Sequence, residues 1–249
     1  MTGPEKNCRA FLLEVYRRLL DHFGLRHWWP ADTPLEVCVG AILTQNVAWR
    51  NVERAIANLK EQGLLVWDNL ARAAETEIEP LIVPTRFYKT KARKLAAFVR
   101  FIAENYGSLE TMFADDLAVL RPRLLKVWGL GPETVDSILL YAGEKPTFVV
   151  DAYTRRVFSR LGVVPPDISY EDLRAFFQGA LPPDVPLYNE YHAQIDALGH
   201  HLCLNQQPRC GACPLGQLCP FPGTLKAPSA VGKPGHGHRL EEAGRTGAN

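Results

Sequence analysis

The segment Val127-Trp128-Gly129-Leu130-Gly131-Pro132-Glu133-Thr134 places two glycines in a tight turn between two apolar segments with helical spacing. A Gly-x-Gly turn leaves backbone N–H groups uncovered. Where such a turn leads into a helix N-terminus, these donors and the helix dipole together favour an anion such as a phosphate. Glycine at a helix-turn-helix corner can also serve only to reverse the chain, so the segment alone predicts a hairpin and leaves phosphate binding open.

An aspartate, Asp151, follows twenty residues after Gly131. It stands between the apolar run at 148–150 and a basic helix start that contains Arg155 and Arg156. Aspartate directly before a helix is typical of an N-cap, whose carboxylate accepts free backbone N–H groups of the first turn. From the residues alone, Asp151 is therefore predicted to cap a helix.

Four cysteines are clustered with the spacing Cys-x6-Cys-x2-Cys-x5-Cys, at Cys203, Cys210, Cys213 and Cys219. A cytoplasmic chain keeps its thiols reduced, so the cluster indicates metal ligands rather than disulfides. Tetrahedral zinc and a 4Fe-4S cluster are both compatible with four thiolates. Zinc sites usually pair two Cys-x2-Cys units, whereas this chain has one, so the spacing favours iron and sulfur.

The remaining sequence predicts an all-α protein of about ten short helices, because apolar residues recur at helical spacing and no segment shows sustained period-two alternation. Thr33-Pro34-Leu35-Glu36 combines an N-cap, a proline at the first helical position and a glutamate at the third. The helix that follows is apolar on every face up to Leu43 and is predicted to be largely buried. Residues 223–249 are rich in Gly, Pro, His and charge, which predicts a disordered tail.

The composition is that of an ordinary globular protein, with 249 residues, 47% hydrophobic and 22% charged residues, and a net charge of +1. It excludes disorder, collagen and coiled coil for most of the chain. The longest apolar run, 35–43, is far shorter than the roughly 20 residues of a membrane-spanning helix. The N-terminus mixes charges into its apolar residues, unlike a secretory signal. We expect a cytoplasmic protein without a membrane partner, associated with the nucleoid if the source is prokaryotic.

Together these features resemble the helix-hairpin-helix DNA glycosylases of the endonuclease III type, and most of all the subgroup of 3-methyladenine DNA glycosylase III. The resemblance covers about residues 8–222. It rests on four pieces in the family's order, namely Leu43-Thr44-Gln45-Asn46, Gly129-Leu130-Gly131, Val149-Val150-Asp151 and the C-terminal cysteine loop. The cysteine spacing is that family's 4Fe-4S pattern, which leaves zinc as a minor alternative.

The resemblance implies two helical domains that flank a DNA-binding cleft. Residues 26–145 would form a six-helix domain with the helix-hairpin-helix motif, and residues 1–25 with 146–222 a helical domain that carries the 4Fe-4S loop. The implied partner is double-stranded DNA with damaged bases, bound by a monomer.

The resemblance also assigns roles in base excision. The damaged nucleotide is flipped out because its sugar carbon cannot be reached in a stacked duplex. Gly129, Leu130 and Gly131 would hold the backbone beside the lesion, and Gln45 would fill the gap left by the flipped base. Asp151 would be the catalytic carboxylate, which stabilises an oxocarbenium-like sugar or aligns a water.

Glu133 is where this chain departs from many family members. Members that also nick the strand carry a lysine two residues after the second glycine, whose amine forms a Schiff base with the sugar. Glutamate cannot form that adduct, and in the first turn of a helix it complements the positive end of the dipole. The sequence therefore predicts a DNA N-glycosylase without AP-lyase activity.

The segment Trp28-Trp29-Pro30 resembles that of the subgroup that removes alkylated purines, 3-methyladenine above all. Such bases carry a positive charge, so they leave easily and attract an aromatic face. Either tryptophan could instead be a core residue, and Trp49 is a further candidate for the base pocket.

Two alternatives stay open at this point. The same fold could remove oxidised or mismatched pyrimidines, as other endonuclease III relatives do. A non-catalytic iron-sulfur protein that binds DNA damage is the alternative from another class, and the retained Asp151 argues against it.

A basic run could contact phosphates or form a solvated helix face; it consists of Arg86, Lys89, Lys91, Arg93 and Lys94.

Overall fold

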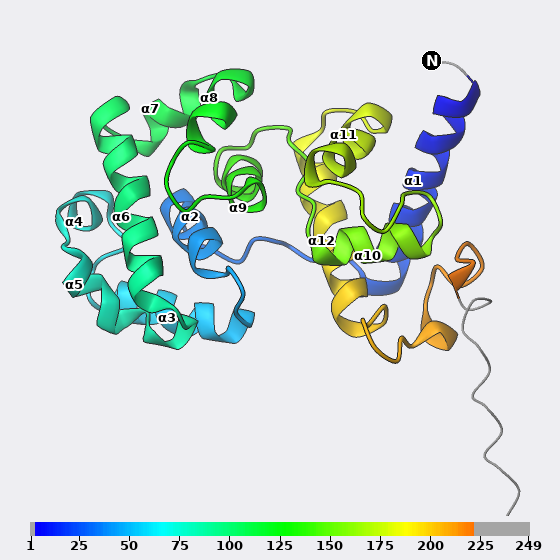
Figure 1. Cartoon of the computed structure of the whole chain (residues 1–249), viewed down its shortest axis with the longest axis horizontal. Helices are drawn as coiled ribbons and strands as arrows, with labels where there is room; N and C mark the ends of the chain where they lie inside the picture. The colour runs from blue at the N-terminus through cyan, green and yellow to red at the C-terminus, as the bar shows by residue number, and fades with distance from the viewer. Residues whose placement is uncertain (1–2, 222–249) are drawn as a thin grey trace, which may run out of the picture.

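The computed structural model describes residues 3–221, whose regular secondary structure consists of helices without a strand, so the all-α prediction is confirmed. Figure 1 shows two groups of helices, one with α2 to α9 and one with α1 and α10 to α12. The predicted disordered tail at 223–249 lies outside the described residues. The elements are α1 (Gly3–Phe23), α2 (Pro34–Leu43), α3 (Trp49–Glu61), α4 (Trp67–Arg72), α5 (Glu75–Ile78), η1 (Glu79–Leu81), η2 (Val83–Thr85), α6 (Tyr88–Asn105), α7 (Leu109–Ala114), α8 (Leu117–Leu124), α9 (Pro132–Ser137), η3 (Ile138–Ala142), α10 (Ala152–Arg160), α11 (Tyr170–Ala180), α12 (Val185–His201) and η4 (Cys210–Ala212).

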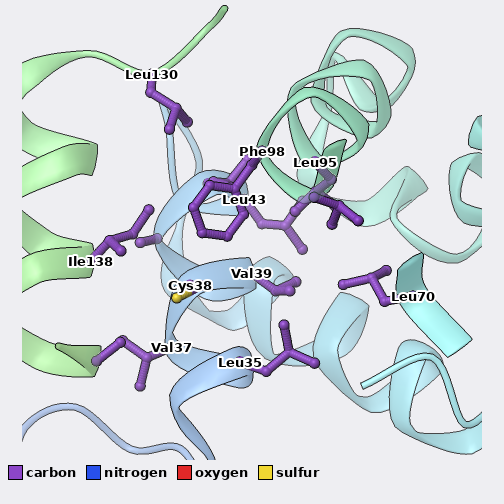
Figure 2. Close-up of a cluster of buried hydrophobic side chains, with 14 of the residues drawn as sticks. Leu35, Val37, Cys38, Val39, Leu43, Leu70, Leu95, Phe98, Leu130 and Ile138 are labelled. Atoms are coloured by element: carbon purple, nitrogen blue, oxygen red, sulfur yellow. The ribbon is translucent and has the colours of Figure 1, made fainter. Parts of the chain in front are cut away.

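The first hydrophobic core surrounds α2, whose residues from Leu35 to Leu43 are all buried, as its apolar sequence predicts. Figure 2 shows its side chains meeting Leu95 and Phe98 of α6 on one side and Ile138 of η3 on another. Because neighbouring elements pack against every face of α2, this helix has no solvent-exposed polar side. It fixes the position of the segment that begins with Thr44.

The start of α2 is capped largely as predicted. The Thr33 hydroxyl accepts the Glu36 backbone N–H at 3.2 Å. The Glu36 carboxylate bonds the backbone N–H of Asp32, one residue before the expected partner, and pairs with Lys60 at 2.8 Å. The buried glutamate is therefore both hydrogen-bonded and charge-compensated, which a buried charge requires.

The second core consists of residues from α1, α10, α11, α12 and the segment that leads to α10. Tyr191 of α12 lies within it and donates its hydroxyl to the Leu12 carbonyl at 2.7 Å. Phe148 stacks on Phe177 with ring centroids 4.1 Å apart. Since residues 148–150 are buried here, Asp151 emerges from a rigid support.

A buried ionic network joins elements of the two cores. Asp136 of α9 is fully buried and accepts both Nε and Nη2 of Arg121 at 2.8 and 2.9 Å. It also accepts the hydroxyls of Tyr170 and Thr147, each at 2.9 Å. Arg121 reaches on to Glu171 of α11 at 2.7 Å. The proposed division into domains at residues 26 and 146 stays a prediction.

No helix within residues 3–221 is long and apolar enough to cross a bilayer.

Candidate functional site

The glycine hairpin connects α8 to α9, and its two glycines differ in their surroundings. Gly129 has a φ of +86°, and a Cβ atom there would lie 2.4 Å from Cγ of Lys94. Gly131 has extended backbone, caps α9 and has open space around its Cα. Leu130 between them is buried in the first core. The hairpin is thus anchored by leucine and packed closely at Gly129, while Gly131 faces outward.

Gln45 lies directly beside this hairpin, in the turn after α2. Its amide nitrogen donates to the Thr134 hydroxyl at 3.1 Å, and its amide oxygen accepts from Lys94. Lys94 also covers Gly129 with its aliphatic stem. The structure therefore brings Gln45 and the hairpin together, as the resemblance implies.

Within the basic run, Lys91 is not available to phosphates. Only 3% of it is exposed, and its ammonium group donates to the carbonyls of Leu43 and Thr85 at 2.8 and 2.7 Å. Burial, with a smaller contribution from the charge of Lys94, lowers the pKa of Lys91 to about 8. For Lys91 the surface interpretation is wrong, because this lysine satisfies the open carbonyl end of the buried helix α2.

Asp151 is the N-cap of α10, as predicted from the residues alone. Its Oδ1 accepts both the backbone N–H and the hydroxyl of Thr154, at 2.7 and 2.8 Å. Its Oδ2 faces Nε2 of His192 at 3.8 Å. Oδ1 of Asp151 therefore caps the helix, whereas Oδ2 does not take part in capping and is available for a reaction.

Glu133 lies in the first turn of α9, where the residue is partly open to solvent while protein atoms surround much of its carboxyl group. Desolvation by the surrounding protein and the charge of Asp151 raise the pKa of Glu133 to about 7, and Arg155 opposes this shift. Glu133 and Asp151 thus influence each other electrostatically, with no lysine at position 133.

The raised pKa of Glu133 predicts a pH dependence of DNA binding. As pH rises through about 7, Glu133 gains a negative charge beside the hairpin, which repels a phosphate backbone. We expect duplex affinity to fall about two- to threefold between about pH 6 and about pH 8 through this group. Glu133→Gln should remove that part of the pH dependence in fluorescence anisotropy. The exposed control Glu61→Gln should keep it, and an unchanged profile in Glu133→Gln would contradict the assignment.

One aromatic cluster consists of Trp28, Trp29 and Trp49. Ring centroids of Trp28, Trp29 and Trp49 lie between 5.0 and 5.2 Å from one another. Trp29 and Trp49 also pack against the first core, and a Cβ on Gly40 would lie 3.1 Å from the Trp29 ring. Pro30 is exposed at the end of the segment. Trp29 therefore has a packing role whether or not it contacts a base.

Tyr141 and His192 connect this cluster to Asp151, and sequence reasoning missed both. The Tyr141 ring lies 5.4 Å from that of Trp29, and its hydroxyl is hydrogen-bonded to Nδ1 of His192 at 2.5 Å. His192 Nε2 in turn faces Asp151. The contacts therefore run from the tryptophans through Tyr141 and His192 to the carboxylate.

The four clustered cysteines line one apolar cavity after α12, together with Leu202, Pro208 and Phe221. Burial raises the pKa of the Cys213 and Cys219 thiols, and each lies near the other cysteines of the set. Arg160 of α10 donates to the Cys203 sulfur at 3.2 Å. Between residues 3 and 221, no group of three or more His, Cys, Asp or Glu side chains is arranged to hold a metal ion.

Comparison with known proteins agrees with this geometry. Residues 39–183 match the HhH-GPD superfamily of base excision DNA repair proteins. A Methanocaldococcus jannaschii protein, provisionally named a DNA repair glycosylase, is 44% identical over 217 residues, which cover 86% of this chain and 98% of that protein. Endonuclease III of Thermotoga maritima is 28% identical over 211 residues, covering 84% of this chain and 92% of that protein.

Two solved structures share the fold. An H. pylori 3-methyladenine DNA glycosylase bound to 1,N6-ethenoadenine has a TM-score of 0.64 at 24% identity, covering 78% of this chain and 96% of that one. An endonuclease III in a non-covalent DNA complex has a TM-score of 0.74 at 21% identity, covering 87% and 97%. This chain belongs to the HhH-GPD superfamily and is a base excision repair DNA glycosylase of the endonuclease III type.

Proposed function

We propose that the protein is a monofunctional glycosylase that hydrolyses the N-glycosidic bond of alkylated purines, with 3-methyladenine as the preferred base, and that it acts as a monomer on double-stranded DNA. The observation that carries the proposal is the contact path from the tryptophan cluster through Tyr141 and His192 to Asp151. It links an aromatic surface to a carboxylate, which supports a site where an aromatic base is held near that carboxylate. Identifying the base released from duplexes with different lesions tests the proposal.

Asp151 supplies the chemistry of bond cleavage. As the base leaves with the bonding electrons, positive charge develops on the sugar, and a nearby carboxylate stabilises it. Water then bonds to the anomeric carbon and its proton passes to Asp151. Because Oδ1 is already held by Thr154, Oδ2 is the oxygen that performs these steps.

The tryptophan cluster favours a cationic purine. A positively charged ring is attracted to an aromatic face, and stacking on such a face contributes about 1–3 kcal/mol per base. A base that already carries positive charge leaves without a strong general acid. The H. pylori 3-methyladenine glycosylase with the same fold supports this choice of substrate.

The hairpin and Gln45 would hold the opened duplex. Gly131 is open at the start of α9, where the backbone can approach a phosphate closely. Gln45 lies beside it on Thr134 and Lys94, where a long amide can enter the base stack. These contacts support a position of the flipped nucleotide between the hairpin and the carboxylate.

The absence of a lysine at position 133 supports hydrolysis without strand cleavage. We predict that borohydride treatment during turnover on lesion DNA gives no covalent protein–DNA complex, because Glu133 has no amine to form a Schiff base. Denaturing electrophoresis should show intact strands until alkali is added. A trapped complex would contradict the proposal. Glu133→Lys should introduce some trapping and nicking, which provides the positive control.

A second candidate substrate is an oxidised or mismatched pyrimidine. The 28% identity to endonuclease III of Thermotoga maritima over most of both chains favours it. The tryptophan cluster favours the alkylated purine instead, since a cationic base gains most from that surface.

We also propose that the cysteine loop holds a 4Fe-4S cluster. Four thiols line one cavity, and their Cys-x6-Cys-x2-Cys-x5-Cys spacing supports this cluster rather than zinc. The residues that would hold it are Cys203, Cys210, Cys213 and Cys219. Bound there, the cluster would supply a structural crosslink between α12, the loop and Arg160 of α10.

Loss of one of these cysteines should release the metal. Protein purified without oxygen is expected to contain iron and acid-labile sulfide in equal amounts. Cys213→Ser should lose most of both and melt at a lower temperature, whereas Cys8→Ser, outside the loop, should keep them. Stoichiometric zinc in the wild type, without sulfide, would contradict the assignment.

A further inference from the structure

His192 presents a buried imidazole nitrogen to the proposed catalytic carboxylate. The side chain is 11% exposed, and Nε2 is buried without a hydrogen-bond partner among the described residues. Oδ2 of Asp151 lies 3.8 Å from Nε2. A buried polar atom without a partner costs free energy, so its position calls for a function.

Tyr141 determines which nitrogen of His192 carries the proton. Its hydroxyl lies 2.5 Å from Nδ1. Desolvation raises the pKa of Tyr141 far above its ordinary value, so the hydroxyl stays protonated and is able to donate its hydrogen bond to Nδ1. With Nδ1 accepting, neutral His192 carries its proton on Nε2, the nitrogen that faces Asp151.

Asp151 has acidic neighbours, among them Glu133 and Asp196. Neighbouring negative charges favour the protonated form of a carboxyl, whereas a hydrogen-bond donor favours the ionised form. Thr154 supplies donors to Oδ1 only. The other titratable or charged groups around the pair are Glu133, Tyr141, Tyr153, Arg155, Glu190, Asp196, His200 and Arg26.

We propose that His192 is a positioning residue that directs its Nε2–H at Oδ2 of Asp151, keeping this oxygen ionised and oriented toward the flipped sugar, with Tyr141 fixing the tautomer. Tyr141 also contacts the Trp29 ring. The inference rests on the proposed role of Asp151, but not on the identity of the lesion.

The test is the pH profile of single-turnover base release on whichever lesion the wild type excises. For His192→Leu we expect the acid limb to move up by about one pH unit and the plateau rate to fall about tenfold. His192→Gln retains an N–H donor and should stay within about threefold of wild type. Tyr141→Phe keeps the ring on Trp29 and should shift the limb in the same direction, but less.

His201→Gln, an exposed histidine on the same helix, is the matched control and should behave as wild type. Melting temperature and affinity for an uncleavable duplex are measured for each variant. A His192→Leu profile that matches wild type would overturn the proposal. Equal losses in the Leu and Gln variants, together with lower melting temperatures, would overturn it as well, because they show a packing role. If the wild type excises no alkylated purine but does excise another lesion, the proposed substrate fails while this test still runs.

Discussion

Asp151→Asn is expected to lower the single-turnover rate of base release about 10³-fold. The negative charge that stabilises the oxocarbenium-like sugar is lost, whereas the side-chain oxygen that accepts from Thr154 is retained. Asparagine is as good an N-cap as aspartate, so the melting temperature should change little. Rapid quenching of a methylated duplex under enzyme excess, followed by quantification of free base, measures the rate.

Asp184→Asn is the matched control for this substitution. Asp184 is the N-cap of α12, where its side chain accepts the Leu187 backbone N–H at 2.7 Å, and it is exposed. It should release base at the wild-type rate. A rate for Asp151→Asn within about threefold of this control would show that the carboxylate charge is not used in the reaction.

Asp136→Ala is expected to lower the free energy of unfolding by about 3–5 kcal/mol. The change leaves the guanidinium of Arg121 without its principal partner and removes the acceptor of the Tyr170 and Thr147 hydroxyls. A buried charge that loses its principal partner carries a large desolvation cost, which the remaining contact with the exposed Glu171 offsets only in part. Urea unfolding followed by circular dichroism measures the difference.

The control is Asp115→Ala, which removes a partly exposed ion pair with Arg123 at 3.3 Å and a hydrogen bond from Tyr106. That loss should cost about 1 kcal/mol or less for the ion pair, because solvent screens it. A cost for Asp136→Ala no greater than for Asp115→Ala would show that the buried network does not stabilise the junction of the two cores.

Much of this fold is readable from local sequence. The apolar residues from Leu35 to Leu43 leave no polar face, so burial on every side follows from composition alone. Thr33 and Asp151 stand directly before helices, where their side-chain oxygens have few alternatives to capping. The two glycines of the hairpin likewise predict a tight turn, because other residues rarely adopt the backbone of Gly129.

The links within the site are not readable in this way. His192 lies in an amphipathic helix where an isolated histidine has no distinguishing neighbour, and Tyr141 appears as one more apolar position after α9. Their roles depend on two elements that are 51 residues apart in the chain. The burial of Lys91 is not readable from local sequence for a related reason. Its ammonium group donates to the carbonyls of Leu43 and Thr85, which do not belong to its own helix.

The central claim is that this site hydrolyses the bond between deoxyribose and a cationic purine. The most direct test incubates the wild-type protein with one pool of duplexes that contain 3-methyladenine, an oxidised pyrimidine or a mismatched thymine, and identifies the free bases by mass spectrometry. We expect 3-methyladenine to be the dominant released base and the DNA strands to stay intact. Preferential release of the pyrimidine, or strand cleavage that accompanies release, would contradict it.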